Sequence, residues 1–109
     1  MSGIQRVNFQ LTEGMARGSV YDTDDIQIMR IRLLANESLP HHNSNANILL
    51  VPMTGRIRLA TTAGEETIGV GEALSVPYQT PMDVSNAGDD IAIFLVLKTP
   101  HPKTFTKPA

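Results

Sequence analysis

The sequence predicts an all-β fold, either a sandwich or a barrel. Short apolar stretches of strand length follow one another along the chain, separated by turns rich in glycine, asparagine and proline. No window of about 11 or more residues has an apolar stripe at helical spacing. An immunoglobulin-like sandwich usually has a core tryptophan and paired cysteines, and the chain has neither residue. Closed or jelly-roll architectures remain favoured.

We predict about eight strands, on the usual spacing of turns in such folds. An alternating strand is expected at 7–11, and a longer strand at 26–34 changes its apolar phase, as a β-bulge would produce. The continuous apolar run at 48–51 predicts a strand buried on both faces. A helical turn fits only at 13–17. Further strands are expected at 56–59, 67–70, 73–76, 82–85 and 91–98, with turns at 62–65 and 86–89.

One domain is expected over residues 1–109, with its core at 26–98. The segment 99–109 contains three prolines. Proline cannot donate to a β-ladder, so we predict a C-terminal tail or an arm that covers an edge.

Composition and charge exclude several classes of protein. The net charge is −2 with both signs interspersed, so no nucleic-acid partner is expected. The chain has no cysteine, which excludes disulfides and thiolate metal sites and fits a reducing compartment. The start lacks the apolar region of a secretory signal, and the longest apolar run, Ile91–Leu97, is far short of the roughly 20 residues that span a bilayer. We therefore predict a cytoplasmic protein without membrane contact.

Two segments carry motifs that resemble those of the cupins. In the second motif, Gly71, Pro77 and Asn86 occupy the spacing of the family's glycine, proline and asparagine. Gln79 stands in place of its second glycine, and Met82 in place of its metal-binding histidine. The resemblance implies a small cupin-type double-stranded β-helix, that is, a jelly-roll barrel.

The first motif departs further from the family pattern. It opens with Leu39-Pro40-His41-His42 and closes at Gly55. Cupins have two histidines separated by one residue and then a glutamate, whereas here the histidines are adjacent and Asn47 lies near the glutamate position. Cupins also often use the region before this motif to pair with a partner subunit, so the resemblance implies a homodimer.

The predicted pocket has few metal ligands. Successive side chains on a strand point to opposite faces, so His41 and His42 cannot both reach one ion unless a bulge redirects one of them. A non-heme iron or manganese site needs two imidazoles and a carboxylate. The pocket supplies His42, Asn47 and Met82, with Tyr78 and Gln79 at its rim. A divalent metal at His41 and His42 is therefore the less favoured interpretation, and no cofactor is assigned.

Four arginines alternate along two strands that we expect to be neighbours: Arg30, Arg32, Arg56 and Arg58. An anion-binding patch is one interpretation. Because Ile31 and Ile57 occupy the opposite faces, we interpret the arginines as a solvated outer face.

Three functions remain open. We favour a cupin that binds a small organic ligand in its barrel, metal-free or with weak metal binding. The second is an enzyme, either a metal-dependent oxygenase or an isomerase or lyase that uses His42 as general acid or base. The third is a dimeric interaction module whose pocket is vestigial.

Overall fold

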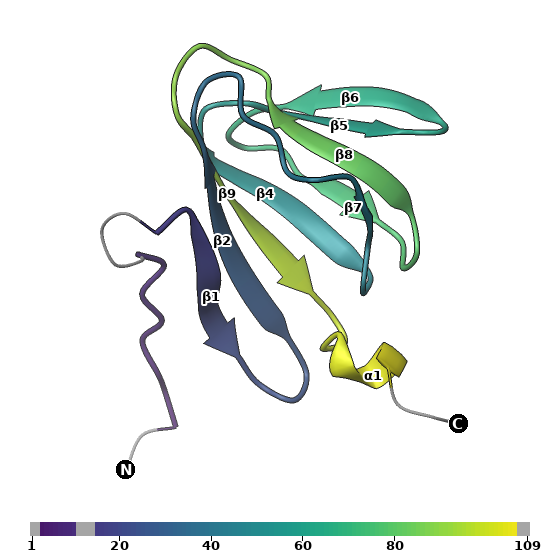
Figure 1. Ribbon diagram of the computed structural model, residues 1–109. Coiled ribbons are helices and arrows are strands. Elements are labelled where there is room, and N and C mark those ends of the chain that lie inside the picture. Colours follow the sequence, from purple (N-terminus) through teal and green to yellow (C-terminus); the bar gives the residue numbers. More distant parts are fainter. Residues whose placement is uncertain (1–2, 11–14, 107–109) are drawn as a thin grey trace.

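The computed structural model describes residues 3–10 and 15–106, which form two facing antiparallel β-sheets (Figure 1). The five-stranded sheet has the order β1-β2-β9-β4-β7. Its strands are β1 Arg17–Asp22, β2 Gln27–Leu33, β9 Ala92–Lys98, β4 Ile48–Thr54 and β7 Leu74–Val76. The four-stranded sheet has the order β3-β8-β5-β6. Its strands are β3 His42–Asn43, β8 Pro81–Asn86, β5 Ile57–Thr61 and β6 Gly64–Ile68.

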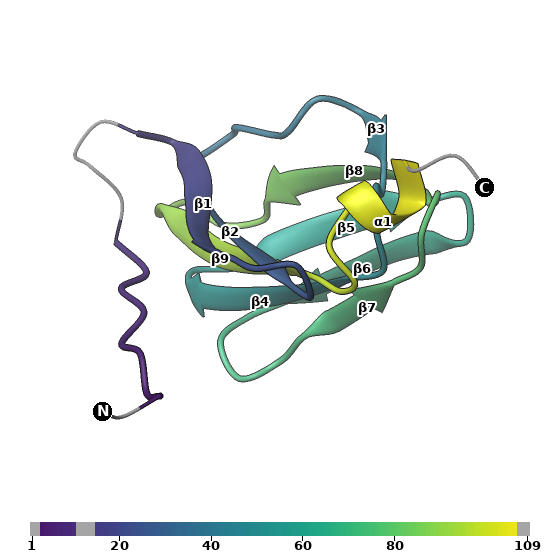
Figure 2. The ribbon, with the colours of Figure 1, turned by 90° about the horizontal axis from the view of Figure 1, so that it is seen from below.

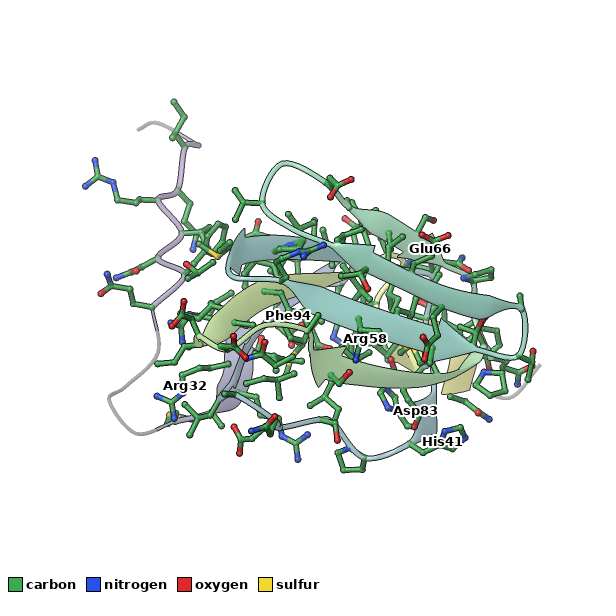
Figure 3. All side chains as sticks on the ribbon, turned by 90° about the horizontal axis from the view of Figure 1, so that it is seen from above. Arg32, His41, Arg58, Glu66, Asp83 and Phe94 are labelled. Atoms are coloured by element: carbon green, nitrogen blue, oxygen red, sulfur yellow. The ribbon has the colours of Figure 1, made fainter. Side chains whose placement is uncertain are left out.

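The core lies between the two sheets. Strands alternate, so each sheet sends every second side chain inward, as antiparallel sheets with one solvated face do. Phe94 and Leu50 from one sheet meet Ile57 and Val84 from the other, and all four are fully buried. Figure 3 shows Phe94 between the sheets. The only helix in the described part of the chain is α1 Lys103–Thr106, so the all-β prediction is confirmed. Within that part, no helix is both long and apolar enough to traverse a bilayer.

Asn86 and Gly55 hold the turns at one end of the sheets. The Asn86 side chain donates to the Leu33 carbonyl (3.0 Å) and the Asp90 carbonyl (2.7 Å), and accepts from the Gly88 amide (2.8 Å). Gly55 has φ of 75°. A Cβ there would lie 2.7 Å from the Ile91 carbonyl oxygen, so only glycine fits without a backbone shift.

The N-terminal elements differ from the prediction. Residues 7–10 form no strand, and residue 11 of that predicted strand lies outside the described residues. The strand β1 was not predicted, because Gly18, Ser19 and Asp22 have weak strand propensity. The bulge predicted within 26–34 is absent, since β2 pairs with β9 in unbroken register; the register shift lies in β1 instead, between Ser19 and Tyr21. Of the helical turn predicted at 13–17, residues 15–17 are not helical and the first two lie outside the described residues.

One prediction about strand faces and one about neighbouring strands are wrong. The run at 48–51 is not buried on both faces, since β4 alternates and Leu49 is 36% exposed. Arg30 and Arg58 do point away from the core, but β2 and β5 belong to different sheets. The four arginines therefore do not form one patch. The burial of 48–51 was mispredicted because the outer face of β4 is also apolar. Periodicity alone cannot separate a strand buried on both faces from one with an apolar outer face.

The C-terminal arm packs where β9 ends (Figures 1 and 2). His101 Nδ1 accepts from the Lys103 amide (3.1 Å), so its Nε2–H donates to Asp22 (2.8 Å). Gln27 also donates to Asp22 (3.0 Å), and these contacts, Gln27 first, lower the pKa of Asp22. The ring of Phe105 stacks on Tyr78 at a centroid distance of 4.1 Å. The arm is thus fixed to β1 and to the loop before β8.

Candidate ligand-binding cavity

A cavity of about 310 Å³ lies between the two sheets. The edge strands β1 and β3, one from each sheet, both contribute to its lining. Its walls are mainly apolar, and their side chains include Met29, Ile31, Leu50, Met82, Phe94 and Val96. This volume is at the small end of the ~300–1,000 Å³ range of ligand pockets. The cavity suits a small molecule.

Half of the polar residues in the lining are basic. The polar residues are Arg17, His42, Asn43, Ser44, Asn45 and Lys98. Three of these side chains are basic. Among the described residues, no aspartate or glutamate lines the cavity.

His42 and Met82 are neighbours on the cavity side of the four-stranded sheet. The two residues are paired in the β3–β8 register, and residues directly opposite in an antiparallel pair project to the same face. The Nδ1 of His42 lies 2.8 Å from the Pro40 carbonyl oxygen. A carbonyl only accepts, so Nδ1 carries the proton and Nε2 is left as the acceptor of the neutral ring.

Asn47, Tyr78 and Gln79, predicted as pocket residues, are not part of the lining. Asn47 accepts a hydrogen bond from the Tyr78 amide (2.9 Å) and so holds the loop before β8. Gln79 has φ of 63° in that loop, and its side-chain Nε2 donates to the Tyr78 hydroxyl (3.3 Å). Ser44 is buried and accepts from the Thr80 amide (2.9 Å), which ties the β3 segment to the same loop. Asn47, Tyr78 and Gln79 therefore shape the loop rather than the cavity, whereas Ser44 both holds the loop and lines the cavity.

His41 lies on the other side of the wall. Its Nδ1 is 3.0 Å from Asp83 on the outward face of β8 (Figure 3), beside a separate hollow of about 220 Å³. His41 and His42 therefore face opposite sides, in agreement with the strand argument, and cannot share one ion. No group of three or more His, Cys, Asp or Glu side chains suited to a metal occurs within residues 3–10 and 15–106. One imidazole and one thioether do not fit the ligand set of a hard divalent metal.

Lys98 is a site residue that the sequence analysis missed. It ends β9, where it pairs with Gln27 and Ile48, and it shares the inward phase of Phe94 and Val96. Burial lowers the pKa of its ammonium group. Its side chain has no hydrogen-bond or ion-pair partner in the part of the chain that the structure describes. The inward alternation along 92–98 was the signal that could have identified it.

Arg17 is the second missed residue. It pairs with Ile31 in the β1–β2 register and lies exposed at the border of the cavity. No sequence pattern pointed to it, because its strand was not predicted.

No protein-family model matches the chain. The uncharacterized protein MJ0764 of Methanocaldococcus jannaschii is 33% identical over 88 residues, which cover 80% of this chain and 76% of that protein. A solved structure of an RmlC-like cupin family protein with a double-stranded β-helix fold, also MJ0764, superposes with a TM-score of 0.79 at 26% identity. That superposition covers 96% of this chain and 100% of the other.

More distant structures support the fold alone. A cupin domain from Bordetella pertussis gives a TM-score of 0.66 at 20% identity, over 78% of this chain and 92% of that one. The Cnp3 cupin domain of Schizosaccharomyces pombe gives 0.70 at 14% identity, over 83% of this chain and 63% of that one. Three findings indicate the same family: the two facing sheets, the M. jannaschii relative, and the retained Gly71, Pro77 and Asn86. The chain therefore belongs to the RmlC-like cupin superfamily.

Proposed function

We propose that the protein binds a small organic ligand in the cavity between its sheets, without a resident metal. The observation that supports this most is the lining itself. Apolar walls with a few converging polar groups are the usual composition of a small-molecule site. The available metal ligands support the metal-free form of the proposal. The residue opposite His42 is Met82, whose thioether is a poor ligand for a hard divalent metal.

The five methionines provide an experiment. Met29 and Met82 line the cavity, whereas Met53 is 42% exposed on the outer face of β4. We expect hexanoate or hexanamide, added to ¹³C-methyl-methionine protein in EDTA, to shift the Met29 and Met82 methyl signals and leave Met53 in place. Unmoved Met29 and Met82 signals with both compounds would contradict the proposal. So would shifts that appear only after a divalent metal replaces EDTA.

An isomerase or lyase that uses His42 is the second candidate. The contact with Pro40 fixes the proton of the neutral ring on Nδ1, which leaves Nε2 able to accept a proton from a ligand. In D₂O the protein should then speed exchange of the C3 protons of 2-oxobutanoate, and His42→Gln should abolish that gain. Exchange at the buffer rate with the unmodified protein would exclude this activity for that ketoacid.

We further propose that two copies associate through the outer face of the five-stranded sheet. Apolar side chains from three neighbouring strands meet there: Ile28, Leu49, Val51, Met53, Ile93 and Leu97. The Nε of Arg32, on the same face, is buried without a hydrogen-bond partner among the described residues. An apolar patch of this kind can pair with its own copy about a twofold axis, so a second copy is the occupant we favour. A cytoplasmic location stays a prediction.

A further inference from the structure

The cavity is positive within a chain that is negative overall. The net charge of the whole sequence is −2. In contrast, the titratable side chains that line the cavity are Arg17, His42 and Lys98, and no described acid faces them. A cation in a mainly apolar site is unfavourable unless an opposite charge compensates it. The protein supplies no such charge to Lys98 within its described residues.

The strand register separates Arg17 from Lys98 along the cavity. Lys98 ends β9, four residues beyond Phe94, while Arg17 is aligned with Ile31, the partner of Phe94 on β2. Four residues of strand span about 13 Å. Lys98 therefore lies at the end of the cavity next to the C-terminal arm, and Arg17 at the opposite border. The apolar side chains of Met29, Phe94 and Val96 fill the interval.

We propose that the ligand is an organic carboxylate with an apolar body, whose carboxylate pairs with the Lys98 ammonium. The apolar body lies against Met29, Phe94 and Val96, and Arg17 attracts the anion at the border. This inference depends on the proposed function and names its ligand class. A single ammonium on one side of a small cavity suits a monoanion, since a phosphate group is usually held by several donors.

The lowered pKa of Lys98 agrees with this assignment. Burial without a counter-ion disfavours the charged amine, and a bound carboxylate supplies the missing charge. His42 offers a further polar contact through Nε2 to a ligand hydroxyl or carboxyl group.

Isothermal titration with two matched pairs tests the proposal: hexanoate against hexanamide, and phenylacetate against phenylacetamide. Each pair has nearly the same shape and differs in charge. We expect the carboxylates to bind the unmodified protein at least tenfold more tightly than the amides. Lys98→Met should lower carboxylate affinity at least tenfold and leave amide affinity unchanged, while Lys98→Arg should retain most of the carboxylate affinity.

Arg58→Met is the matched control, since it removes a cation from the outward face of β5, away from the cavity lining (Figure 3). It should leave all four affinities unchanged. Equal binding of carboxylates and amides would overturn the inference and leave the proposed function standing. Absence of binding by all four compounds would overturn both. The comparison of carboxylates with amides uses the unmodified protein, so it tests the preference for a carboxylate even if Lys98→Met does not fold.

Discussion

Replacing Met82 by histidine would restore a second imidazole to the cavity. Met82 is directly opposite His42, and the Cβ atoms of such pairs lie about 4.5–5.5 Å apart on the same face of the sheet. Two imidazoles at that spacing can bind one ion. We expect Met82→His to raise affinity for nickel or zinc at least tenfold, which corresponds to about 1.4 kcal/mol. Because Met82 is 3% exposed, the metal-free variant should lose roughly 1–3 kcal/mol of stability through burial of a polar ring.

Titration calorimetry and thermal melts, with and without metal, measure both quantities. Val84→His is the control, since Val84 also lines the cavity but lies two residues further along β8, about 7 Å away. It should cost stability without the gain in affinity. Adding His42→Ala to Met82→His should remove the gain. A lower melting temperature with unchanged metal affinity would refute the reasoning, because His42 and residue 82 would then not face one another.

Three further predictions concern stability and assembly. Asn86→Ala removes three hydrogen bonds and should cost roughly 2–4 kcal/mol in denaturant unfolding, with a fall in Tm of about 10 °C or more; a change within error would contradict their role. Light scattering should give about twice the 11.9 kDa chain mass, and Leu49→Arg, but not the control Val70→Arg, should yield monomer; a monomeric unmodified protein would exclude the dimer. Because the pKa of Lys98 is lowered in the fold, its ammonium destabilises the protein below that pKa, and the penalty disappears as pH rises toward the ordinary value of 10.5. Melts should therefore show Lys98→Met to be more stable than the unmodified protein at neutral pH, with a difference that shrinks at high pH, whereas a constant difference would assign the effect to packing.

Local patterns were sufficient for the fold class. Glycine and asparagine at turns and the alternation along β5 and β8 follow from short-range sterics, and they favour antiparallel sheets. The same alternation predicted that His41 and His42 face opposite sides. By contrast, β1 was missed because its residues have weak strand propensity and its pairing with β2 depends on the rest of the sheet.

The cavity residues were harder to predict, because a lining is defined by register between strands distant in sequence. Lys98 lies next to Ile48 only through the β4–β9 pairing, and Arg17 reaches the cavity only because β1 joins the sheet beside β2. Asn47 and Tyr78 were placed in the pocket from motif spacing. Their hydrogen bond instead fixes the loop before β8, a contact that spacing along the chain does not specify.

A crystal structure of the protein with phenylacetate, grown in the presence of EDTA, would show whether the cavity binds an organic carboxylate at Lys98 without a metal. We expect the aromatic ring between the two sheets against Phe94, with a carboxylate oxygen about 2.7–3.2 Å from Lys98 Nζ. Phenylacetate bound only in the outer hollow beside His41 and Asp83, or a cavity without ligand at concentrations that saturate binding in solution, would contradict it.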